Sequence, residues 1–597
     1  MVEASTSFEE SSVTTDTQTA AQTGSQTDSQ RRIDNDLDAL AKHKDEWARL
    51  PVASKIEHLR TLASNTSAQA ERWVAAACDA KGLDRTSPLA GEEWTSGPWA
   101  LLFGINRLIE TLTAIETTGT PRLRPKSVHT RRDGQVVVDV FPQSGWDRLL
   151  LSGISAEVWM QPGVTRDNLA DTMAVFYKQR SPHGAVALVL GAGNIASIPP
   201  LDVLYKMVAE GRVCLLKMNP VNEYLGPVFE DVFADLVAAG FLRVAYGGSD
   251  VGDYLANHRG VDEIHITGSN RTHDAIVFGA GKEGAARKRR GEPVNTKRMT
   301  SELGNVSPTI VVPGPWSERD LRFQAAHIAT QKLHNAGFNC IASQVLITAR
   351  RWSLTEPLLA EVASVMSRAP RRPAYYPGAA QRQRALAQAH PAARMLGGDD
   401  ASPTTLITDV DSTDGTEMCF RDEAFAGVLT ATSLPARSMD EYLDRAVDFC
   451  NDSLWGTLGA NIIIHPATAR RHAEALDRAI ARLRYGCIGV NAWTGVGFLL
   501  AQASWGAFPG HTADDIQSGI GVVHNSLLFD RPQKSVVRAP FHPYPRSLAH
   551  GQPTLLPTPP WFVTHRHAHQ VNERLTRFEA DHAVARVPGI FLAALRS

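Results

Sequence analysis

The chain has 597 residues, of which 43% are hydrophobic and 21% are charged. This composition is typical of a globular protein and excludes a fibre, a membrane-spanning bundle and wholesale disorder. Lysine and arginine number 61 and aspartate and glutamate 63, so the formal net charge at pH 7 is -2. Because no global field favours nucleic acid or anionic lipid, we expect a small-molecule partner, no nucleic acid and no membrane span.

The cysteines are scattered singly, without CxxC pairs. They are Cys78, Cys214, Cys340, Cys419, Cys450 and Cys487. This usage favours free thiols in a reducing, cytoplasmic environment. The N-terminus has neither a basic start nor an apolar stretch, which argues against a secretory signal.

The N-terminal part of the chain divides into a polar tail and a helical segment. Residues 1–31 are rich in Ser, Thr and Gln, and this composition predicts a disordered tail. From Asn35 onward, apolar residues recur at three-to-four spacing in three stretches, each followed by Pro or Gly. This spacing predicts amphipathic helices over 36–51, 54–82 and 99–116.

Extended segments follow these helices. Residues 135–142, 156–163 and 173–182 have the composition of strands, with a helical stretch over 164–173 between the last two. We expect them to form a hairpin or a β-arm, placed at about 155–182.

From Gly184 onward, short apolar strands alternate with helices, and a second alternating block starts at Ser307. Such alternation predicts parallel sheets covered by helices on both faces, an architecture typical of nucleotide-binding proteins. The basic stretch 279–293 interrupts the first block, and we expect it to be a solvated loop. The last 70 or so residues are Pro-rich and are expected to be irregular.

The segment LVLGAGNIA fits the G-x-G-x-x-G/A dinucleotide fingerprint through Gly191, Gly193 and Ala196. That fingerprint needs an acidic residue about 20 positions later, whereas the next strand ends in Lys217 and Asn219. The ordinary Rossmann interpretation therefore loses support.

A series of short motifs offers another interpretation of these residues. The series contains Asn194 in LGAGNIASIPPL, Lys217 in CLLKMNP, Gly268 and Ser269 in HITGSN, Glu302 in SELGNVSP, and Cys340 in NAGFNCIAS. In content and order it resembles the aldehyde dehydrogenase superfamily, over roughly residues 35–525. The resemblance implies an α/β fold with a Rossmann-type nucleotide-binding domain, an α/β catalytic domain and a β-arm for oligomerisation.

The chemistry of aldehyde oxidation explains why such residues would be needed together. A cysteine thiolate both adds to an aldehyde carbon and later leaves, so we expect Cys340 to be the nucleophile. The side-chain amide of Asn194 and the backbone N–H of Cys340 would form an oxyanion hole, with each donor contributing about 3 kcal/mol. Glu302, 38 residues before the cysteine, is the expected general base for hydrolysis of the thioester.

Each of these three residues also has a structural interpretation. A lone cysteine is more often a small buried hydrophobe than a nucleophile, an asparagine caps a helix or takes a turn conformation, and a glutamate lies on the surface. The sequence surroundings of Cys340, Glu302 and Asn194 favour the catalytic interpretation.

The resemblance also implies a nicotinamide cofactor, NAD or NADP. The expected cofactor-binding residues are Lys217, Gly268, Ser269, Glu423 and Phe425, the last two in RDEAFAGVL. Two departures from the family pattern stand out. Ala426 and Gly427 replace the usual Gly-Pro, and Pro220 stands where a ribose-binding carboxylate is common, with Glu223 the nearest acid. The choice between NAD and NADP therefore stays open.

The resemblance sets the expected domain organisation. A nucleotide-binding domain with its preceding helices covers 32–302, a catalytic domain covers 303–525, and a C-terminal extension covers 526–597. The extension offers an oligomerisation strand in SLLFDRPQKSVVRAP, and we expect a homodimer or homotetramer.

Substrate and metal binding are less well defined. Asn491 would lie near the substrate funnel, and Trp493 with Phe498–Leu500 suggests an apolar or aromatic aldehyde. The run THRHAHQ places three histidines at period two, but no carboxylate or thiol is close to them in sequence, so we expect no metal.

Two rival functions remain at this point. One is a CoA-acylating aldehyde dehydrogenase or acyl-CoA reductase, which has no need of the hydrolytic carboxylate that Glu302 provides. The other is a catalytically inactive relative that binds nucleotide. An unreactive Cys340 thiol would be its signature.

Overall fold

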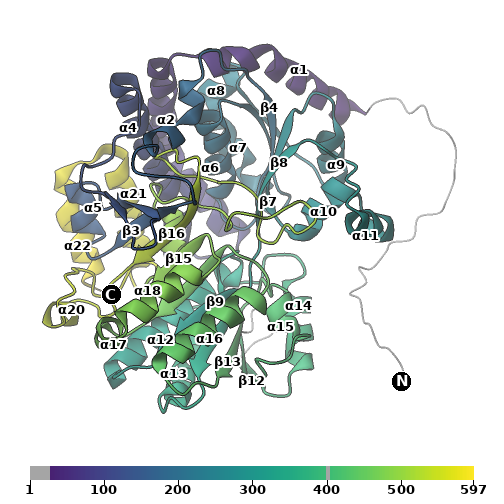
Figure 1. The fold of residues 1–597 in the computed structure, drawn as a ribbon. Coiled ribbons are helices and arrows are strands. Elements are labelled where there is room, and N and C mark those ends of the chain that lie inside the picture. Colours follow the sequence, from purple (N-terminus) through teal and green to yellow (C-terminus); the bar gives the residue numbers. More distant parts are fainter. Residues whose placement is uncertain (1–26, 398–403, 597) are drawn as a thin grey trace.

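The computed structural model describes residues 27–397 and 404–596, arranged as two α/β units, each built around its own sheet (Figure 1). Four helices come before β1 (Val128–Thr130), at the start of the described chain. They are α1 (Asp28–Arg49), α2 (Val52–Ala80), α3 (Ala90–Trp94) and α4 (Ala100–Thr118). The three helices predicted in this region are confirmed as α1, α2 and α4. The predicted disordered tail lies mostly outside the described residues, and α1 already begins at Asp28, after a capping box made by Thr27 and Gln30.

The first sheet is fully parallel, with strand order β6-β5-β4-β7-β8. Its strands are β4 (Val186–Leu190), β5 (Val213–Lys217), β6 (Leu242–Ala245), β7 (Glu263–Gly268) and β8 (Arg298–Leu303). The connecting helices are α6 (Ile198–Leu204), α7 (Gly226–Val232), α8 (Ala234–Ala238), α9 (Ser249–Asn257), α10 (Asn270–Phe278) and α11 (Gly281–Arg290). The predicted parallel sheet is confirmed. The chain leaves β4 first toward β5 and later returns to β7 on its other side, which makes the carboxyl edge beside β4 a topological switch point.

The basic stretch 279–293 is not the loop that we expected. Most of it forms α11, which ends at Gly291 in the left-handed conformation. Four basic residues occupy its last turn, where positive charge interacts favourably with the helix dipole.

The second sheet has eleven strands in the order β1-β2-β3-β16-β15-β14-β9-β10-β13-β12-β11. The seven strands from β16 to β12 run parallel, and antiparallel strands complete both ends. The strands are β1 (Val128–Thr130), β2 (Val136–Phe141), β3 (Ser155–Met160), β9 (Ser307–Val311), β10 (Ser343–Ala349), β11 (Ala393–Leu396), β12 (Thr404–Val410), β13 (Val428–Leu434), β14 (Gly459–Ile463), β15 (Cys487–Val490) and β16 (Pro532–Arg538). The helices of this unit are α5 (Gly145–Leu150), α12 (Glu318–Leu333), α13 (Thr355–Arg368), α14 (Ala379–Ala389), α15 (Met418–Arg421), α16 (Met439–Asp452), α17 (Pro466–Arg471), α18 (Ala473–Arg482) and α19 (Thr494–Leu499).

The predicted arm is only partly correct. Strands form at 155–160 and 532–538, but they pair with each other as β3 and β16 inside one continuous sheet. The expected strand at 173–182 is wrong, because Val175–Lys178 is a 3₁₀ helix. Adjacent residues Phe176 and Tyr177 both place their rings within 5.3 Å of the buried Lys55 ammonium, an arrangement that the alternating side chains of a strand do not allow. The predicted helix over 164–173 is reduced to one 3₁₀ turn.

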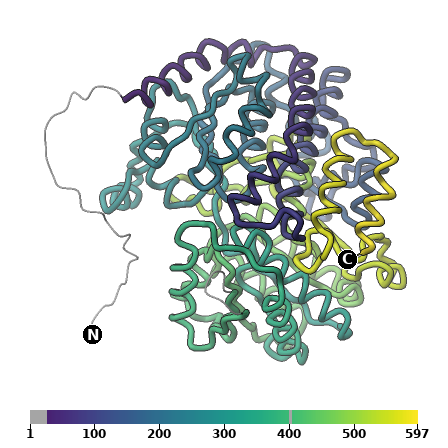
Figure 2. The backbone as a smooth tube through the Cα atoms, turned by 180° about the vertical axis from the view of Figure 1, so that it is seen from behind, coloured from purple at the N-terminus to yellow at the C-terminus, as the bar shows by residue number. Residues whose placement is uncertain are grey.

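The C-terminal extension is not irregular. It contains α20 (Arg546–Ala549), α21 (Ala568–Asp581) and α22 (Val587–Ala594). Figures 1 and 2 show these yellow helices beside the purple and blue helices near the N-terminus. The packing of α21 against α3 is close, since a Cβ on Gly91 would lie 2.6 Å from the backbone of Ala568. No helix in the described ranges is long and apolar enough to cross a membrane.

Candidate active site

The two residues expected to react with the substrate meet at the junction of the two units. Glu302 stands at the carboxyl end of β8, and Cys340 lies in the loop that leads into β10. The Cys340 thiol donates a hydrogen bond of 3.2 Å to Glu302 Oε1. The structure therefore brings together two side chains that the sequence separates by 38 residues.

The surroundings of this pair change the proton affinity of both groups. The pKa of the Cys340 thiol is raised well above its ordinary value by burial of the sulfur and by the nearby carboxyls of Glu302 and Glu423. Burial, with a smaller contribution from Asp202, raises the pKa of Glu302 to about 7. The resting pair is therefore a protonated thiol beside a carboxyl group that titrates near neutrality, where a general base works best.

The loop before Cys340 takes an unusual conformation. After α12, a short turn spans His334–Gly337, and Asn335, Ala336 and Gly337 all have positive φ angles. Gly337 is needed there, because a Cβ would lie 2.5 Å from the Ala426 carbonyl oxygen. Positive φ angles in non-glycine residues are costly and persist only where surrounding contacts hold them.

Asn194 lies against this loop, as the oxyanion-hole hypothesis requires. Its side-chain amide donates a 3.0 Å hydrogen bond to the Phe338 carbonyl, which uses one of its two amide hydrogens. The described chain offers no acceptor for the second amide hydrogen. The backbone carbonyl of Asn194 accepts hydrogen bonds of 3.0 Å from the side-chain amide of Asn335 and from the Tyr375 hydroxyl. Asn194 is thus held on both sides, with one donor left free.

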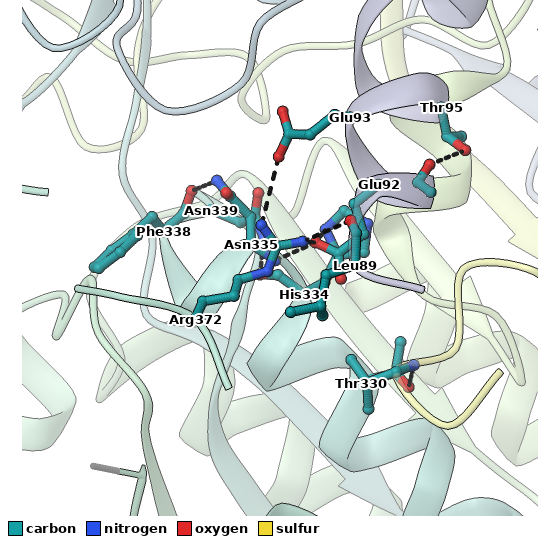
Figure 3. A network of polar contacts seen from close by, with 12 residues as sticks. Leu89, Glu92, Glu93, Thr95, Thr330, His334, Asn335, Phe338, Asn339 and Arg372 are labelled. Carbon is teal, nitrogen blue, oxygen red and sulfur yellow. Dashed lines mark hydrogen bonds and ion pairs between the residues drawn. The ribbon is translucent and has the colours of Figure 1, made fainter. Parts of the chain in front are cut away.

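A buried network of charged groups holds the other side of the loop (Figure 3). Glu92 on α3 accepts a 2.7 Å hydrogen bond from the Asn335 backbone N–H and forms an ion pair with Arg372. The Arg372 guanidinium also contacts Glu93, which pairs with Lys81 at 2.9 Å. All four charged side chains are less than 9% exposed. The network connects α3 to the loop that carries Cys340.

Sequence reasoning missed Glu92, Arg372 and Tyr375. They come from segments that are distant from one another in the chain and belong to no motif in the series described above. The one available signal is the doublet Glu92–Glu93 in a short segment rich in apolar and small residues, since carboxylates are rarely buried without a partner.

The predicted cofactor-binding residues Lys217, Gly268 and Ser269 end β5 and β7 at the carboxyl edge of the first sheet. Ser269 caps α10 by accepting a 3.1 Å hydrogen bond from the Thr272 N–H. The N-terminus of this nine-residue helix therefore lies at that edge of the sheet. Lys217 is 7% exposed, and its ammonium group has no hydrogen bond or ion pair with any described residue. A buried ammonium and a helix N-terminus at the same edge of the sheet, with β4 between their strands, suit the phosphates of a dinucleotide.

Glu423 and Phe425 lie on the opposite side, in the second unit. The Glu423 carboxyl packs so closely on the main chain that a Cβ on Gly304 would lie 2.0 Å from its Oε2. Its buried Oε1 has no hydrogen-bond partner among the described residues, and burial raises the pKa of this carboxyl to about 8. The Phe425 ring packs on Tyr376 with ring centroids 4.8 Å apart. An unsatisfied buried oxygen of this kind fits a ribose hydroxyl as its missing donor.

The structure does not support the expected role of Asn491. Its side chain accepts from the Ile464 N–H at 2.8 Å and donates to the Ile464 carbonyl at 3.0 Å. These bonds fix the carboxyl end of β15 to that of β14, whereas Cys340 precedes β10 at the amino ends of the parallel strands. Asn491 therefore holds two strands together at the opposite edge of the sheet.

The residues that follow Asn491 lie closer to the site. The Trp493 indole donates a 3.2 Å hydrogen bond to the Ile341 carbonyl, next to Cys340. Phe498 packs on a cluster that includes Ile195, the neighbour of Asn194. The three histidines of the run at 565–569 lie just before and at the start of α21 rather than on one face of a strand.

These features define a two-unit α/β protein in which a cysteine–glutamate pair lies beside the carboxyl edge of a dinucleotide-type sheet. Comparison with known proteins agrees with this assignment. The family model described as "Aldehyde dehydrogenase family" matches residues 160–502, more than half of the chain. The chain belongs to the aldehyde dehydrogenase family.

Its similarity to individual members is distant. An aminoacetaldehyde dehydrogenase from Pseudomonas aeruginosa is 28% identical over 340 residues, which cover 53% of this chain and 60% of that protein. An N-succinylglutamate 5-semialdehyde dehydrogenase from Sphingopyxis alaskensis is 29% identical over 191 residues, 32% of this chain and 36% of that protein. The chain thus matches less than two thirds of the length of these curated relatives.

Solved structures share the fold over a longer range. Lactaldehyde dehydrogenase from Escherichia coli superposes with a TM-score of 0.57 at 16% identity, covering 85% of this chain and 91% of that one. An aldehyde dehydrogenase from Pseudomonas syringae, solved with NAD+ and octanal, gives 0.55 at 18% identity over 86% and 90% of the two chains.

Proposed function

We propose that the protein oxidises an aldehyde to a carboxylic acid with a nicotinamide cofactor, through a covalent intermediate on Cys340. The observation that carries this proposal is the 3.2 Å contact between the Cys340 thiol and Glu302 at the junction of the two units. A nucleophile and a general base within hydrogen-bonding distance are what a covalent route needs.

In the first step, the Cys340 sulfur attacks the carbonyl carbon while Glu302 accepts the thiol proton. A C–S bond forms, and the electron pair of the carbonyl π bond moves to the oxygen. The resulting oxyanion meets the second amide hydrogen of Asn194 and the backbone N–H of Cys340, two donors that the fold holds in place before the reaction. Because the Asn335 and Tyr375 contacts fix Asn194, this oxyanion hole needs little rearrangement.

When bound, the nicotinamide cofactor supplies the hydride acceptor for the oxidation. Lys217 and the N-terminus of α10, which Ser269 caps, would hold its pyrophosphate half, and the unpaired Oε1 of Glu423 would accept a ribose hydroxyl. Gly268, exposed at the end of β7, would lie against the cofactor at the same edge. The Phe425 ring, fixed by Tyr376, would provide an apolar wall.

Hydrolysis of the thioester completes the proposed cycle. Glu302 first releases the thiol proton to solvent, and the carboxylate then removes a proton from water; the hydroxyl oxygen bonds to the acyl carbon, the C–S bond breaks, and the thiolate leaves. The buried carboxyl in contact with the sulfur supports water rather than coenzyme A as the acyl acceptor, since transfer to a thiol acceptor does not need this base.

The charges near Lys217 support NAD as the cofactor. Burial lowers the pKa of Lys217, and the carboxylates of Asp250 and Glu223 oppose that shift. These carboxylates would repel the 2′-phosphate of NADP. We therefore infer a higher kcat/KM with NAD than with NADP.

The apolar residues around Phe498 support an apolar substituent on the aldehyde. Phe498 and Leu499 line one small cavity together with Leu201, Leu204 and His524. The expected homodimer or homotetramer stays a prediction. Because β3 and β16 both lie inside the sheet of one chain, association through this sheet would use its outer strands β1 and β11.

Absorbance at 340 nm tests the proposal, with purified protein, a panel of aliphatic and aromatic aldehydes, and either NAD or NADP. We expect reduced NAD to accumulate with an apolar aldehyde, and Cys340→Ala to lower turnover by at least about 10³-fold without loss of NAD binding. The control is Cys450→Ala, which removes a buried thiol from the hydrophobic core of the second unit and should keep the activity. Full activity in Cys340→Ala would overturn the proposal.

A further inference from the structure

A second group of reactive side chains lies outside the proposed active site, between the end of α14 and the start of α15. His390 Nε2 lies 3.2 and 3.1 Å from the two carboxyl oxygens of Glu417 and 3.9 Å from the Cys419 sulfur. The side chains of His390 and Glu417 are 13% and 11% exposed, and Cys419 is 5% exposed. Three common metal-ligand types therefore converge in a largely buried position.

The hydrogen bonds of His390 fix which nitrogen points into this group. His390 Nδ1 lies 2.7 Å from the Leu386 carbonyl oxygen, and a carbonyl only accepts, so Nδ1 carries the hydrogen. In a neutral ring, the lone pair on Nε2 faces two carboxylate oxygens and a sulfur, and these electron-rich atoms can share either a proton on Nε2 or a bound metal cation. Donation from the second ring nitrogen to a carbonyl is also the usual outer contact of a metal-bound histidine.

The ligand atoms lie within a few tenths of an ångström of the separations from His390 Nε2 that a tetrahedral zinc site needs. Bond lengths of about 2.0–2.1 Å to nitrogen, 2.0–2.2 Å to oxygen and 2.3 Å to sulfur imply ligand-to-ligand separations of about 3.3–3.6 Å. The observed separations from His390 Nε2 are 3.1–3.9 Å. One thiolate, one imidazole and one carboxylate form a donor set suited to zinc.

A comparable cluster elsewhere in the described chain already has an arginine guanidinium as its positive charge. Asp320, His465 and His542 also converge, but the Arg546 guanidinium pairs with the Asp320 carboxylate. His465 Nδ1 accepts a hydrogen bond from the Ala467 N–H, which leaves the hydrogen on Nε2. At Glu417, by contrast, His390 is the one ion-pair partner found among the described residues.

We propose that His390, Glu417 and Cys419 bind one zinc ion, with water as the fourth ligand. On binding, the Cys419 thiol releases its proton to solvent and a Zn–S bond forms, with no change in oxidation state. The ion would connect the end of α14 to α15, whose last residue is followed after one position by Glu423. If the proposed function holds, zinc therefore steadies the segment that carries Glu423 and Phe425.

Metal titration of the full-length protein in a Cys340→Ala background tests this proposal, because that variant removes the thiol that contacts Glu302. After treatment with a chelator and buffer exchange, we expect one equivalent of Co2+ to produce a near-ultraviolet thiolate-to-cobalt absorption that Zn2+ then removes. Adding Cys419→Ser should abolish the band, and adding His390→Gln should weaken metal binding at least about tenfold. The matched control Cys450→Ser should leave both unchanged.

X-ray absorption of the zinc-loaded Cys340→Ala protein gives a second test that needs no change in the cluster. We expect one sulfur at about 2.3 Å and otherwise nitrogen and oxygen ligands. A shell without sulfur, the absence of stoichiometric binding, or a cobalt band that persists in Cys419→Ser would each overturn the proposal. Because aldehyde oxidation is measured separately in the parent protein, failure of the zinc site is distinguishable from failure of the proposed function.

Discussion

The two sides of the loop that carries Cys340 differ in how completely their carboxyl groups are paired. Behind the loop, Glu92 and Glu93 are both paired with cations, and Asn335 is bonded through its backbone and its side chain. In front of it, Glu423 Oε1 has no partner among the described residues, and the Cys340 thiol has a single partner, Glu302. Unpaired groups are costly to bury, so they persist at the front because the contacts at the back fix the loop. The difference suggests that reactivity depends on residues that never touch the substrate.

The largest effect should come from removing the base at the front. Glu302→Gln keeps the size of the side chain but cannot take a proton, so we expect steady-state turnover to fall by about 10²–10⁴-fold. Binding of NAD, followed by protein fluorescence, should stay within about twofold of the parent. Asp250→Asn, which changes a carboxyl to an amide away from the thiol, is the control and should keep most of the activity with NAD. Unchanged turnover in Glu302→Gln would show that Glu302 is not the general base.

Removing Arg372 from the ion network behind the loop should mainly lower the stability of the fold. Arg372→Met leaves two buried glutamates with Lys81 as their remaining strong partner, and loss of one member of a buried ion network costs about 3–5 kcal/mol. We expect a lower denaturation midpoint and, in protein that still folds, slower alkylation of Cys340 by iodoacetamide.

The matched control for this variant is Arg85→Met, which removes an exposed ion pair with Asp79. Exposed pairs contribute less than about 1 kcal/mol, so the control should be nearly neutral. Equal stability of the Arg372→Met and Arg85→Met proteins would show that the buried network does not hold the loop.

The pH dependence of the free energy of unfolding should reveal the cost of burying the Glu302 carboxyl at the front of the loop. Burial raises the pKa of Glu302 to about 7 in the folded chain, from its ordinary value of 4.5. Between these values the folded state binds more protons than the unfolded state, so the stability contributed by Glu302 is complete below about pH 4.5 and is lost as the pH rises to about 7. Relative to Glu302→Gln, the parent should lose up to about 3 kcal/mol over this range, measured by urea unfolding at several pH values. A pH-independent difference between the two proteins would contradict a raised pKa.

The smallest effect should come from the C-terminal extension. Asn572 on α21 donates a 3.0 Å hydrogen bond to the Gly91 carbonyl, one residue before Glu92. Because the Thr95 hydroxyl also bonds to this carbonyl, Asn572→Ala should cost only about 1 kcal/mol and lower the melting temperature slightly. The exposed Asn257→Ala is the control and should stay within about 0.5 kcal/mol of the parent. If Asn572→Ala loses no more stability than this control, the C-terminal extension does not support the segment that holds the Cys340 loop.

The contrast between front and back also explains what the sequence could predict. Cys340, Glu302 and Asn194 stand in short motifs whose order is informative, and the structure brings all three together. The alternation of strands and helices from Gly184 onward predicted the parallel sheet, because buried parallel strands have a strong compositional pattern.

The back of the loop could not be predicted in this way. Arg372 and Tyr375 follow α13 in a segment without periodicity, and their partners Glu92 and Asn194 lie far away in the chain. Contacts between distant side chains leave no local pattern. The failed strand at 173–182 has a similar cause, since packing of Phe176 and Tyr177 around the buried Lys55 overrides their strand propensity.

The most direct test of the central claim is mass spectrometry of the Glu302→Gln protein after mixing with NAD and an aldehyde that the parent oxidises. In this variant the Cys340 thiol must release its proton to water instead of to Glu302, so acylation is slower than in the parent, but the thioester that forms has no base for its hydrolysis. The acyl group should therefore accumulate as one adduct on the peptide that contains Cys340, while the parent shows little. An adduct on another cysteine would contradict this account, as would hydride transfer by Glu302→Gln without any acyl adduct.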